Sequence, residues 1–267
     1  MKKMITTCMA AAVVLTTSAV AEFNFAQAPE KLTTYYASAI QPLDSLKVKL
    51  GNNGFEVLAT TEVLAGESVI TITNAELKAT NSYMATLHVL VNTSKNEIRV
   101  QNPSYLGAAY LQDSYKYGQF KATLTALEAT LGTMNEVEEK TDFDDLSSYR
   151  FMFGMPRLQD TISVIKGENL DAKLSSASIA YSIKLSNGAT LVGHTLQKKT
   201  NKFLKKIGQE HNAQLLPYEA MIQNGEVTVL DPKYYLALSL PLLSMGEFMK
   251  IATVPDQIVK DIKSAYE

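Results

Sequence analysis

Residues 97–105, with the sequence EIRVQNPSY, return later in the chain as residues 226–234, with the sequence EVTVLDPKY. Two further matches keep the same order, 80–84 (TNSYM) with 200–204 (TNKFL) and 118–120 (GQF) with 246–248 (GEF). An ordered series of matches at nearly constant spacing indicates an internal duplication. The sequence therefore predicts two copies of one domain in tandem.

Each copy mixes strands with helices, so we expect an α+β fold. In the first copy, strands are expected at 32–39, 55–59, 69–73, 83–91 and 97–101. A helix is expected from Pro42, because proline favours a helix start, and an apolar stripe predicts another over 120–131, closed by Gly132. In the second copy, 179–185 alternates like a half-buried strand and turns at 187–188 (NG), and Pro255 begins a last helix that buries Ile258, Ile262 and Tyr266.

The chain divides at a shift in composition. We expect a signal peptide over 1–21, a first α+β repeat over 22–133, an acidic linker over 134–148 and a second repeat over 149–267. The acidic run lacks the ligand spacing and central glycine of a calcium-binding EF-hand loop, so a solvated linker is the prediction. The second copy carries nine extra residues around 205–213, where we expect a helix over 200–211 with Thr200 as its cap.

The first residues have the layout of a cleavable leader. Lys2 and Lys3 precede a short apolar segment, and 19–21 (AVA) supplies the small residues of a cleavage site, so the mature chain is expected to begin at Glu22. Cys8, the single cysteine, lies inside this leader, which leaves the mature chain without cysteine. A cysteine-free secreted chain indicates a bacterial periplasm. The apolar segment is too short to span a bilayer.

Charge excludes one class of partner. The leader holds two lysines and no acid, so its removal takes the net charge from −2 to −4. No run of lysines and arginines interleaved with aromatic residues is present, only the short pairs 198–199 and 205–206 (KK), so nucleic-acid binding is not expected.

The second copy resembles the family catalogued as domain of unknown function 302. Asn201 opens a helical segment, 215–219 (LLPYE) enters a strand, and 227–232 (VTVLDP) leads into a closing helix. Lys202 stands where that family usually has proline, and Tyr218 where it often has cysteine. The resemblance covers roughly residues 150–266 and implies a TATA-binding-protein-like domain, with a curved antiparallel sheet and helices packed on one face. For the whole chain this gives two tandem βαββαββα-type domains. Because members of the family are often single domains that associate, the tandem chain is expected to form an intramolecular pseudo-dimer; the resemblance implies no activity and no cofactor.

Residue types give little catalytic signal. His88 and His194 are expected in strands, and His211 at an exposed helix end. No metal-ligand spacing, nucleophile elbow, phosphate-binding loop or dinucleotide fingerprint is present, and no cofactor or metal is expected. The tyrosines at 105, 110, 115, 117, 234 and 235 suit an interface, a ligand cleft or half-buried strands.

The leading hypothesis is a non-enzymatic module that binds a small ligand or a protein partner through its concave sheet faces or the cleft between the domains. The alternative is an enzyme with a dispersed site in the second copy, for which His194, Glu219 and Asp231 are the candidate residues. A third hypothesis is a periplasmic copper carrier that uses histidine with the methionines of 152–155 and 245–249, although methionine beside aromatics is more typical of core packing.

Overall fold

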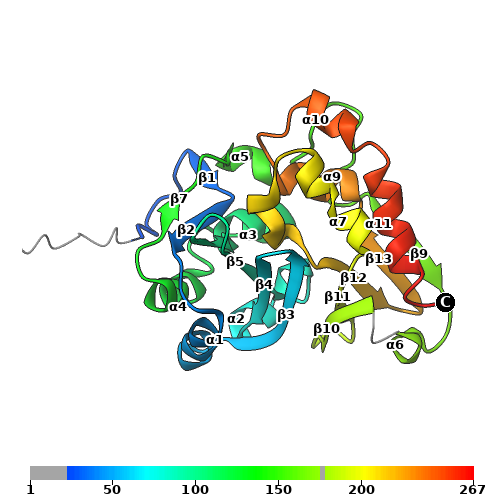
Figure 1. Ribbon diagram of the computed structural model, residues 1–267, viewed down its shortest axis with the longest axis horizontal. Coiled ribbons are helices and arrows are strands. Elements are labelled where there is room, and N and C mark those ends of the chain that lie inside the picture. Colours follow the sequence, from blue (N-terminus) through cyan, green and yellow to red (C-terminus); the bar gives the residue numbers. More distant parts are fainter. Residues whose placement is uncertain (1–22, 175–177) are drawn as a thin grey trace, which may run out of the picture.

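The computed structural model describes residues 23–174 and 178–267 (Figure 1). The predicted signal peptide and its cleavage site lie outside these residues. No helix in the described part of the chain is long and apolar enough to cross a membrane.

Two antiparallel sheets form the frame of the described residues. Sheet 1 has six strands in the order β3-β4-β5-β6-β2-β7, and sheet 2 has five strands in the order β10-β11-β12-β13-β9. Together with the helices, these sheets confirm the α+β class. The strands of sheet 1 are β2 (Tyr35–Ala39), β3 (Glu56–Leu64), β4 (Glu67–Thr73), β5 (Leu87–Asn92), β6 (Glu97–Gln101) and β7 (Asn135–Glu136). Those of sheet 2 are β9 (Thr161–Lys166), β10 (Ile179–Lys184), β11 (Thr190–His194), β12 (Tyr218–Gln223) and β13 (Glu226–Leu230).

The duplicated sequence corresponds to a duplicated strand order. If β7 is left out, sheet 1 has the order β3-β4-β5-β6-β2 and sheet 2 the order β10-β11-β12-β13-β9. In both sheets the strand that comes first in the chain lies at the edge, next to the strand that comes last. Both copies also break register at the same point of the first hairpin, between Val57 and Ala59 and between Ile179 and Tyr181. A bulge is a specific local feature that related folds retain. The two sheets therefore share topology down to an irregularity.

The repeated Asn-Pro and Asp-Pro pairs begin equivalent helices, α3 (Pro103–Leu111) and α9 (Pro232–Ser239). The side chain of Asn102 accepts a hydrogen bond from the backbone N–H of Ser104 at 2.9 Å, and that of Asp231 accepts one from Lys233 at 2.8 Å. Proline in the first turn needs no N–H partner and has the φ angle of a helix. The sequence match thus marks a strand followed by a capped helix in both copies.

Longer helices cover the outer face of each sheet. In the first copy α1 (Leu43–Asn52) contacts α4 (Lys121–Leu131), which ends at Gly132 with φ +79° as predicted. In the second copy α11 (Val254–Lys263) begins around Pro255 and buries Ile258 and Ile262. The remaining helices are α2 (Ala75–Lys78), η1 (Tyr83–Ala85), η2 (Gln112–Ser114), α5 (Phe143–Leu146), α6 (Leu170–Lys173), α7 (Lys198–Asn201), α8 (Phe203–Lys206), η4 (Glu210–Leu215) and α10 (Met245–Lys250).

Three predicted elements differ in the structure. The expected strand over 32–39 is two strands, β1 (Lys31–Thr33) and β2, and the expected strand over 83–91 begins with the 3₁₀ helix η1. The expected helix over 200–211 is divided into α7, α8 and η4, and Gly208, with φ +68°, interrupts the helical path between α8 and η4. Thr200 is not its cap; its hydroxyl donates a hydrogen bond to Asp261 at 2.6 Å.

The acidic segment 134–148 is not a solvated linker, and that prediction is wrong. It contributes β7, which pairs with β2, and β8 (Lys140–Asp142), which pairs with β1. Glu139 is only 8% exposed, and its carbonyl accepts a hydrogen bond from the backbone N–H of Thr34 at 2.8 Å. Sparse apolar residues, Val137 and Leu146, pack inward and hold the segment against the fold.

The inner faces of the two sheets meet elements of the other copy. Segment η4 of the second copy lies over sheet 1, where the His88 ring contacts the carbonyl of Gln214 at 2.8 Å. In return, the hydroxyl of Tyr83, in η1 of the first copy, donates to the carbonyl of Thr228 in sheet 2 at 3.0 Å. These contacts cover part of the inner face of sheet 1.

The Thr-Asn pairs of the duplication make a second reciprocal contact. Asn81 accepts hydrogen bonds at the β10–β11 turn, from the Ser186 hydroxyl at 2.8 Å and the backbone N–H of Asn187 at 3.1 Å. Asn201 donates to the carbonyl of Val63, at the end of β3 and beside the β3–β4 turn, at 3.1 Å. Equivalent asparagines therefore each bind the first hairpin of the opposite copy, which is the pattern of a two-fold interface.

Tyrosine hydroxyls also bind across the two copies. Tyr35 and Tyr105 of the first copy donate, each at 2.8 Å, to the carbonyls of residues 239 and 238 of the second copy. Tyr149, at the start of the second repeat, donates at 2.8 Å to the carbonyl of residue 237 within its own copy. These carbonyls belong to the last turn of α9, where helical partners run out. The sequence left three roles for the tyrosines, in an interface, a ligand cleft or half-buried strands, and Tyr105 lies in the interface between the copies.

Candidate functional site

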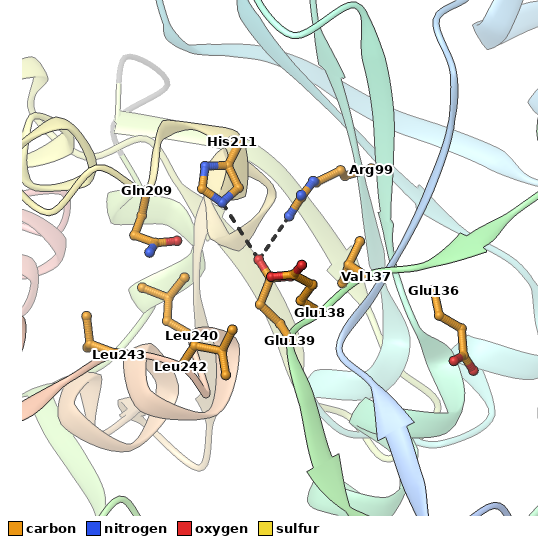
Figure 2. A pocket seen from close by; sticks show the side chains of 10 residues that line it. All are labelled: Arg99, Glu136, Val137, Glu138, Glu139, Gln209, His211, Leu240, Leu242 and Leu243. Carbon is orange, nitrogen blue, oxygen red and sulfur yellow. Dashed lines mark hydrogen bonds and ion pairs between the residues drawn. The ribbon is translucent and has the colours of Figure 1, made fainter.

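A pocket of about 420 Å³ opens where sheet 1, the acidic segment and the second copy meet (Figure 2). Its polar wall includes Arg99 of β6, the carboxylates of 136, 138 and 139, and His211 of η4. The facing wall consists of Leu240, Leu242 and Leu243, from the connection between α9 and α10. Pockets of this size and mixed lining are typical of sites for small molecules.

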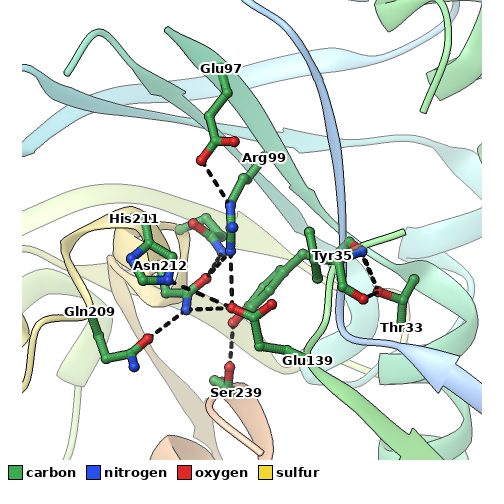
Figure 3. A network of polar contacts seen from close by, with 11 residues as sticks. Thr33, Tyr35, Glu97, Arg99, Glu139, Gln209, His211, Asn212 and Ser239 are labelled. Carbon is green, nitrogen blue, oxygen red and sulfur yellow. Dashed lines mark hydrogen bonds and ion pairs between the residues drawn. The ribbon is translucent and has the colours of Figure 1, made fainter. Parts of the chain in front are cut away.

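Glu139 is the centre of the polar wall (Figure 3). One of its carboxylate oxygens, Oε1, lies 3.1 Å from Nη1 of Arg99, 3.1 Å from Nδ2 of Asn212 and 3.7 Å from Nε2 of His211. Arg99 also donates to Glu97 at 3.1 Å and to Oδ1 of Asn212 at 2.8 Å. The cluster thus joins a strand of the first copy, the acidic segment and η4 of the second copy.

The surroundings of Glu139 keep it ionised. Burial raises the pKa of its carboxyl, but hydrogen bonds from His211 and Asn212 and the charge of Arg99 outweigh burial and lower the pKa to about 2. A buried carboxylate with several donors and a guanidinium partner is held in one position. Glu139 and Arg99 therefore present a fixed, pre-ordered surface at the pocket.

The pocket carries an excess of negative charge. Glu138 and Glu139 lie near the guanidinium of Arg99 and the imidazole of His211, and Glu136 lies farther away on the same segment (Figure 2). Arg99 already contacts two carboxylates, and Glu136 pairs with Lys140 at 2.5 Å. Glu138 is exposed. The polar wall therefore suits a cation better than an anion.

The site exists because the two copies have diverged. The duplicated segment has Arg99 in the first copy and Thr228 at the matching place in the second. His211 and Asn212 lie in the longer connection that the second copy has between Asn201 and β12. The arginine is present only in the sheet of the first copy, and the segment with His211 and Asn212 is present only in the second copy. The cluster around Glu139 therefore has no counterpart at the equivalent place of the second sheet.

The structure does not bring together the three candidates from the sequence. His194 pairs with Tyr218 across the sheet and points to the helix side, where its Nε2 lies 3.0 Å from the hydroxyl of Tyr266. Glu219, the next residue along β12, points to the opposite face and accepts hydrogen bonds from Thr86 and Tyr181. Asp231 caps α9.

Burial governs the ionisation of these groups. It raises the pKa of Glu219 to about 7 and lowers that of His194 to about 4. Burial also raises the pKa of Asp231. Because His194 and Glu219 lie on opposite faces of one sheet, they share no cavity in which a dispersed catalytic site could operate.

The other two histidines differ in accessibility. His88, predicted in a strand, lies in β5 and is 2% exposed, and burial lowers its pKa to about 4. His211 is half-buried against Glu139 and not at an exposed helix end as expected. Sequence reasoning missed Arg99, Glu139 and Asn212. The available signal was Arg99 itself, the charged residue that replaces Thr228 in the duplicated strand.

Of the methionines named for a copper site, Met155 is partly buried against the core and the other three are not. Met152, Met245 and Met249 are exposed, contrary to the packing role expected for them. Within the described residues, no group of three or more His, Cys, Asp or Glu side chains could hold a metal ion. The copper hypothesis therefore rests on residue types alone.

Comparison with protein-family models, curated proteins and solved structures gave no match to this chain.

Proposed function

We propose that this protein binds a small organic cation with an apolar part in the pocket between its two copies. The observation that carries the proposal is the opposition of the two pocket walls, with Glu138 and Glu139 on one side and three leucines on the other (Figure 2). The ammonium group of such a ligand would face the carboxylates while its hydrocarbon part contacts the leucines.

Two features support a binding role without chemistry. Hydrogen bonds from His211 and Asn212 and the charge of Arg99 keep Glu139 ionised, and its pKa of about 2 is far below the range of a general acid or base near neutral pH. The exposed Glu138 and Leu242 are free to contact a ligand without disturbing the buried cluster. Binding energy would come from charge attraction at the open rim and from apolar burial.

A series of ligands with one chain length tests the charge preference. We expect n-hexylamine to bind in isothermal titration calorimetry at neutral pH, and hexanoate to bind at least about tenfold more weakly, since its charge is reversed. Hexanol, which is neutral, should fall between them. Hexanoate binding as tightly as hexylamine would contradict the proposal.

Two pocket variants and one control locate the binding. Glu138→Gln and Leu242→Ala should each weaken hexylamine by about three- to tenfold, because one removes a charge and the other removes apolar contact. Both side chains are exposed, so neither change should affect folding. Glu168→Gln, at an exposed position outside the pocket lining, should leave affinity unchanged.

We further propose that the chain is a secreted periplasmic protein and an intramolecular pseudo-dimer of two domains of the family of unknown function 302. The leader-like first residues support secretion. The shared strand order and the reciprocal contacts of Asn81 and Asn201 support the pseudo-dimer. A binding pocket between the copies agrees with such an assembly, because ligand sites often lie at domain interfaces.

A further inference from the structure

Exposed large hydrophobic side chains gather in one part of the molecule. Among the described residues they are Val48, Met152, Phe153, Leu242, Met245 and Met249. Five of these six belong to two short segments, 152–153 and 242–249. Phe153 is 90% exposed, which leaves almost its whole ring in water. A cluster of exposed apolar side chains marks an interaction site more often than single scattered apolar residues do.

The two segments lie side by side. The rings of Phe151 and Phe248 stack with their centroids 5.3 Å apart. This contact places the loop that carries residues 152–153 against α10, at the top of the molecule (Figure 1). Met245 and Met249 are four residues apart on α10 and therefore share one side of the helix. We name Met152, Phe153, Met245 and Met249 the apolar tip.

Positive charge accompanies the apolar tip. Residues 150–157 read RFMFGMPR, so an arginine stands at each end of the apolar loop. The guanidinium of Arg150 lies 5.1 Å from the centre of the Phe153 ring, and Lys250 follows Met249. The acid on the same helix, Glu247, is used in the capping box with Ser244. Arginine and lysine beside aromatic and methionine side chains suit the boundary between lipid headgroups and acyl chains.

The shape of the apolar tip favours a lipid surface over a protein. The four side chains of the tip lie outside the pocket between the two copies and outside the pockets lined by Glu67, by Phe203, by Tyr36 and by Ile40. A projecting ring with flexible methionines beside it enters a soft medium without needing a matching cavity. Flanking cations then meet anionic headgroups. We propose that the apolar tip inserts into the interface of a bilayer that contains anionic lipid.

Sedimentation with vesicles tests this proposal on the full mature chain. The probes are vesicles of phosphatidylcholine alone and vesicles with about one third phosphatidylglycerol. We expect the wild type to bind the anionic vesicles at low salt, and Phe153→Ser to bind them about tenfold more weakly, since one aromatic side chain stays in water. Arg150→Gln with Arg157→Gln should also weaken binding by about tenfold or more.

Val48→Ser is the matched control, because Val48 is also exposed but lies on α1, away from the apolar tip. It should bind as the wild type does. The proposal is overturned if the wild type does not sediment with anionic vesicles, or if Phe153→Ser sediments equally well. It is also overturned if the wild type is a dimer in light scattering, does not bind vesicles and becomes a monomer on Phe153→Ser, since the occupant would then be a second copy of the chain.

Discussion

Replacing Arg99 by methionine is expected to lower the free energy of unfolding by about 3–5 kcal/mol at pH 7. The side chains of Arg99 and Glu139 are 13% and 10% exposed, and their charges lie 3.1 Å apart. Methionine fills similar space but leaves the buried Glu139 carboxylate without its guanidinium partner. Loss of one partner from a buried ion pair costs far more than loss of the pair itself.

The dependence on pH identifies the cause. In the wild type the pKa of Glu139 is about 2 in the folded state against an ordinary value of 4.5, so its contribution is present above pH 4.5 and is lost as the pH falls towards 2. Arg99→Met raises this pKa. The difference in stability between variant and wild type should therefore be large at pH 7 and smaller at pH 3.

Urea denaturation followed by far-ultraviolet circular dichroism measures both values, because the chain has no tryptophan. The double variant Arg99→Met with Glu139→Gln should recover part of the loss. Lys31→Met is the control, since Lys31 pairs with Asp142 at an exposed site and should cost less than about 1 kcal/mol. A loss for Arg99→Met that is no greater than this, or that stays constant with pH, would contradict the pairing.

Local rules predicted those parts of the fold that depend on neighbouring residues. The start of α1 after Pro42, the end of α4 at Gly132 and the hairpin turn at Gly188 each follow from one residue's backbone preference. The duplication predicted that both sheets would follow one plan. It could not predict that each inner face is covered by the other copy, because that contact joins residues far apart in sequence.

The candidate site was harder to predict, for a physical reason. Glu139 lies in a segment with several other acidic residues, most of them exposed, and its contacts with Arg99 and Asn212 distinguish it from them. Burial of one acid in a charge run is a tertiary effect and leaves no periodic pattern. His194 and Glu219 lie on neighbouring strands, but Glu219 is one residue beyond Tyr218, the cross-strand partner of His194. Because successive side chains along a strand point to opposite faces, the two candidates lie on opposite faces of the sheet.

Replacing Glu219 by glutamine is expected to stabilise the protein at pH 8 by up to about 3 kcal/mol relative to its effect at pH 4.5. Burial raises the pKa of Glu219 to about 7 from an ordinary 4.5. Its partners, Thr86 and Tyr181, are neutral hydroxyls that do not balance a charge. The folded state therefore holds this proton more tightly than the unfolded state, and stability falls as the pH rises from 4.5 to 7.

Other buried groups also change the stability with pH, some in the same direction as Glu219 and some in the opposite direction. The pH dependence of the wild-type unfolding free energy alone therefore does not reveal the contribution of Glu219. His88 and His194 have their pKa lowered to about 4 by burial, which makes stability rise with pH between 4 and 6.5. Glu67 has its pKa raised to about 7, chiefly by burial, and acts in the same direction as Glu219. These contributions are common to wild type and variant and cancel in the difference between them.

The measurement is therefore the difference in unfolding free energy between Glu219→Gln and wild type at intervals from pH 4.5 to 8. A constant offset from altered hydrogen bonding with Tyr181 shifts the whole curve, whereas the titration of Glu219 gives a rise in favour of the variant with increasing pH. Glu226→Gln, at a side chain 30% exposed and paired with Lys166 on the same sheet, should show no such rise. A flat difference curve for Glu219→Gln would mean that water or a shift of β12 relieves the buried charge, and that the contact between the two copies at Thr86 is looser than the structure shows.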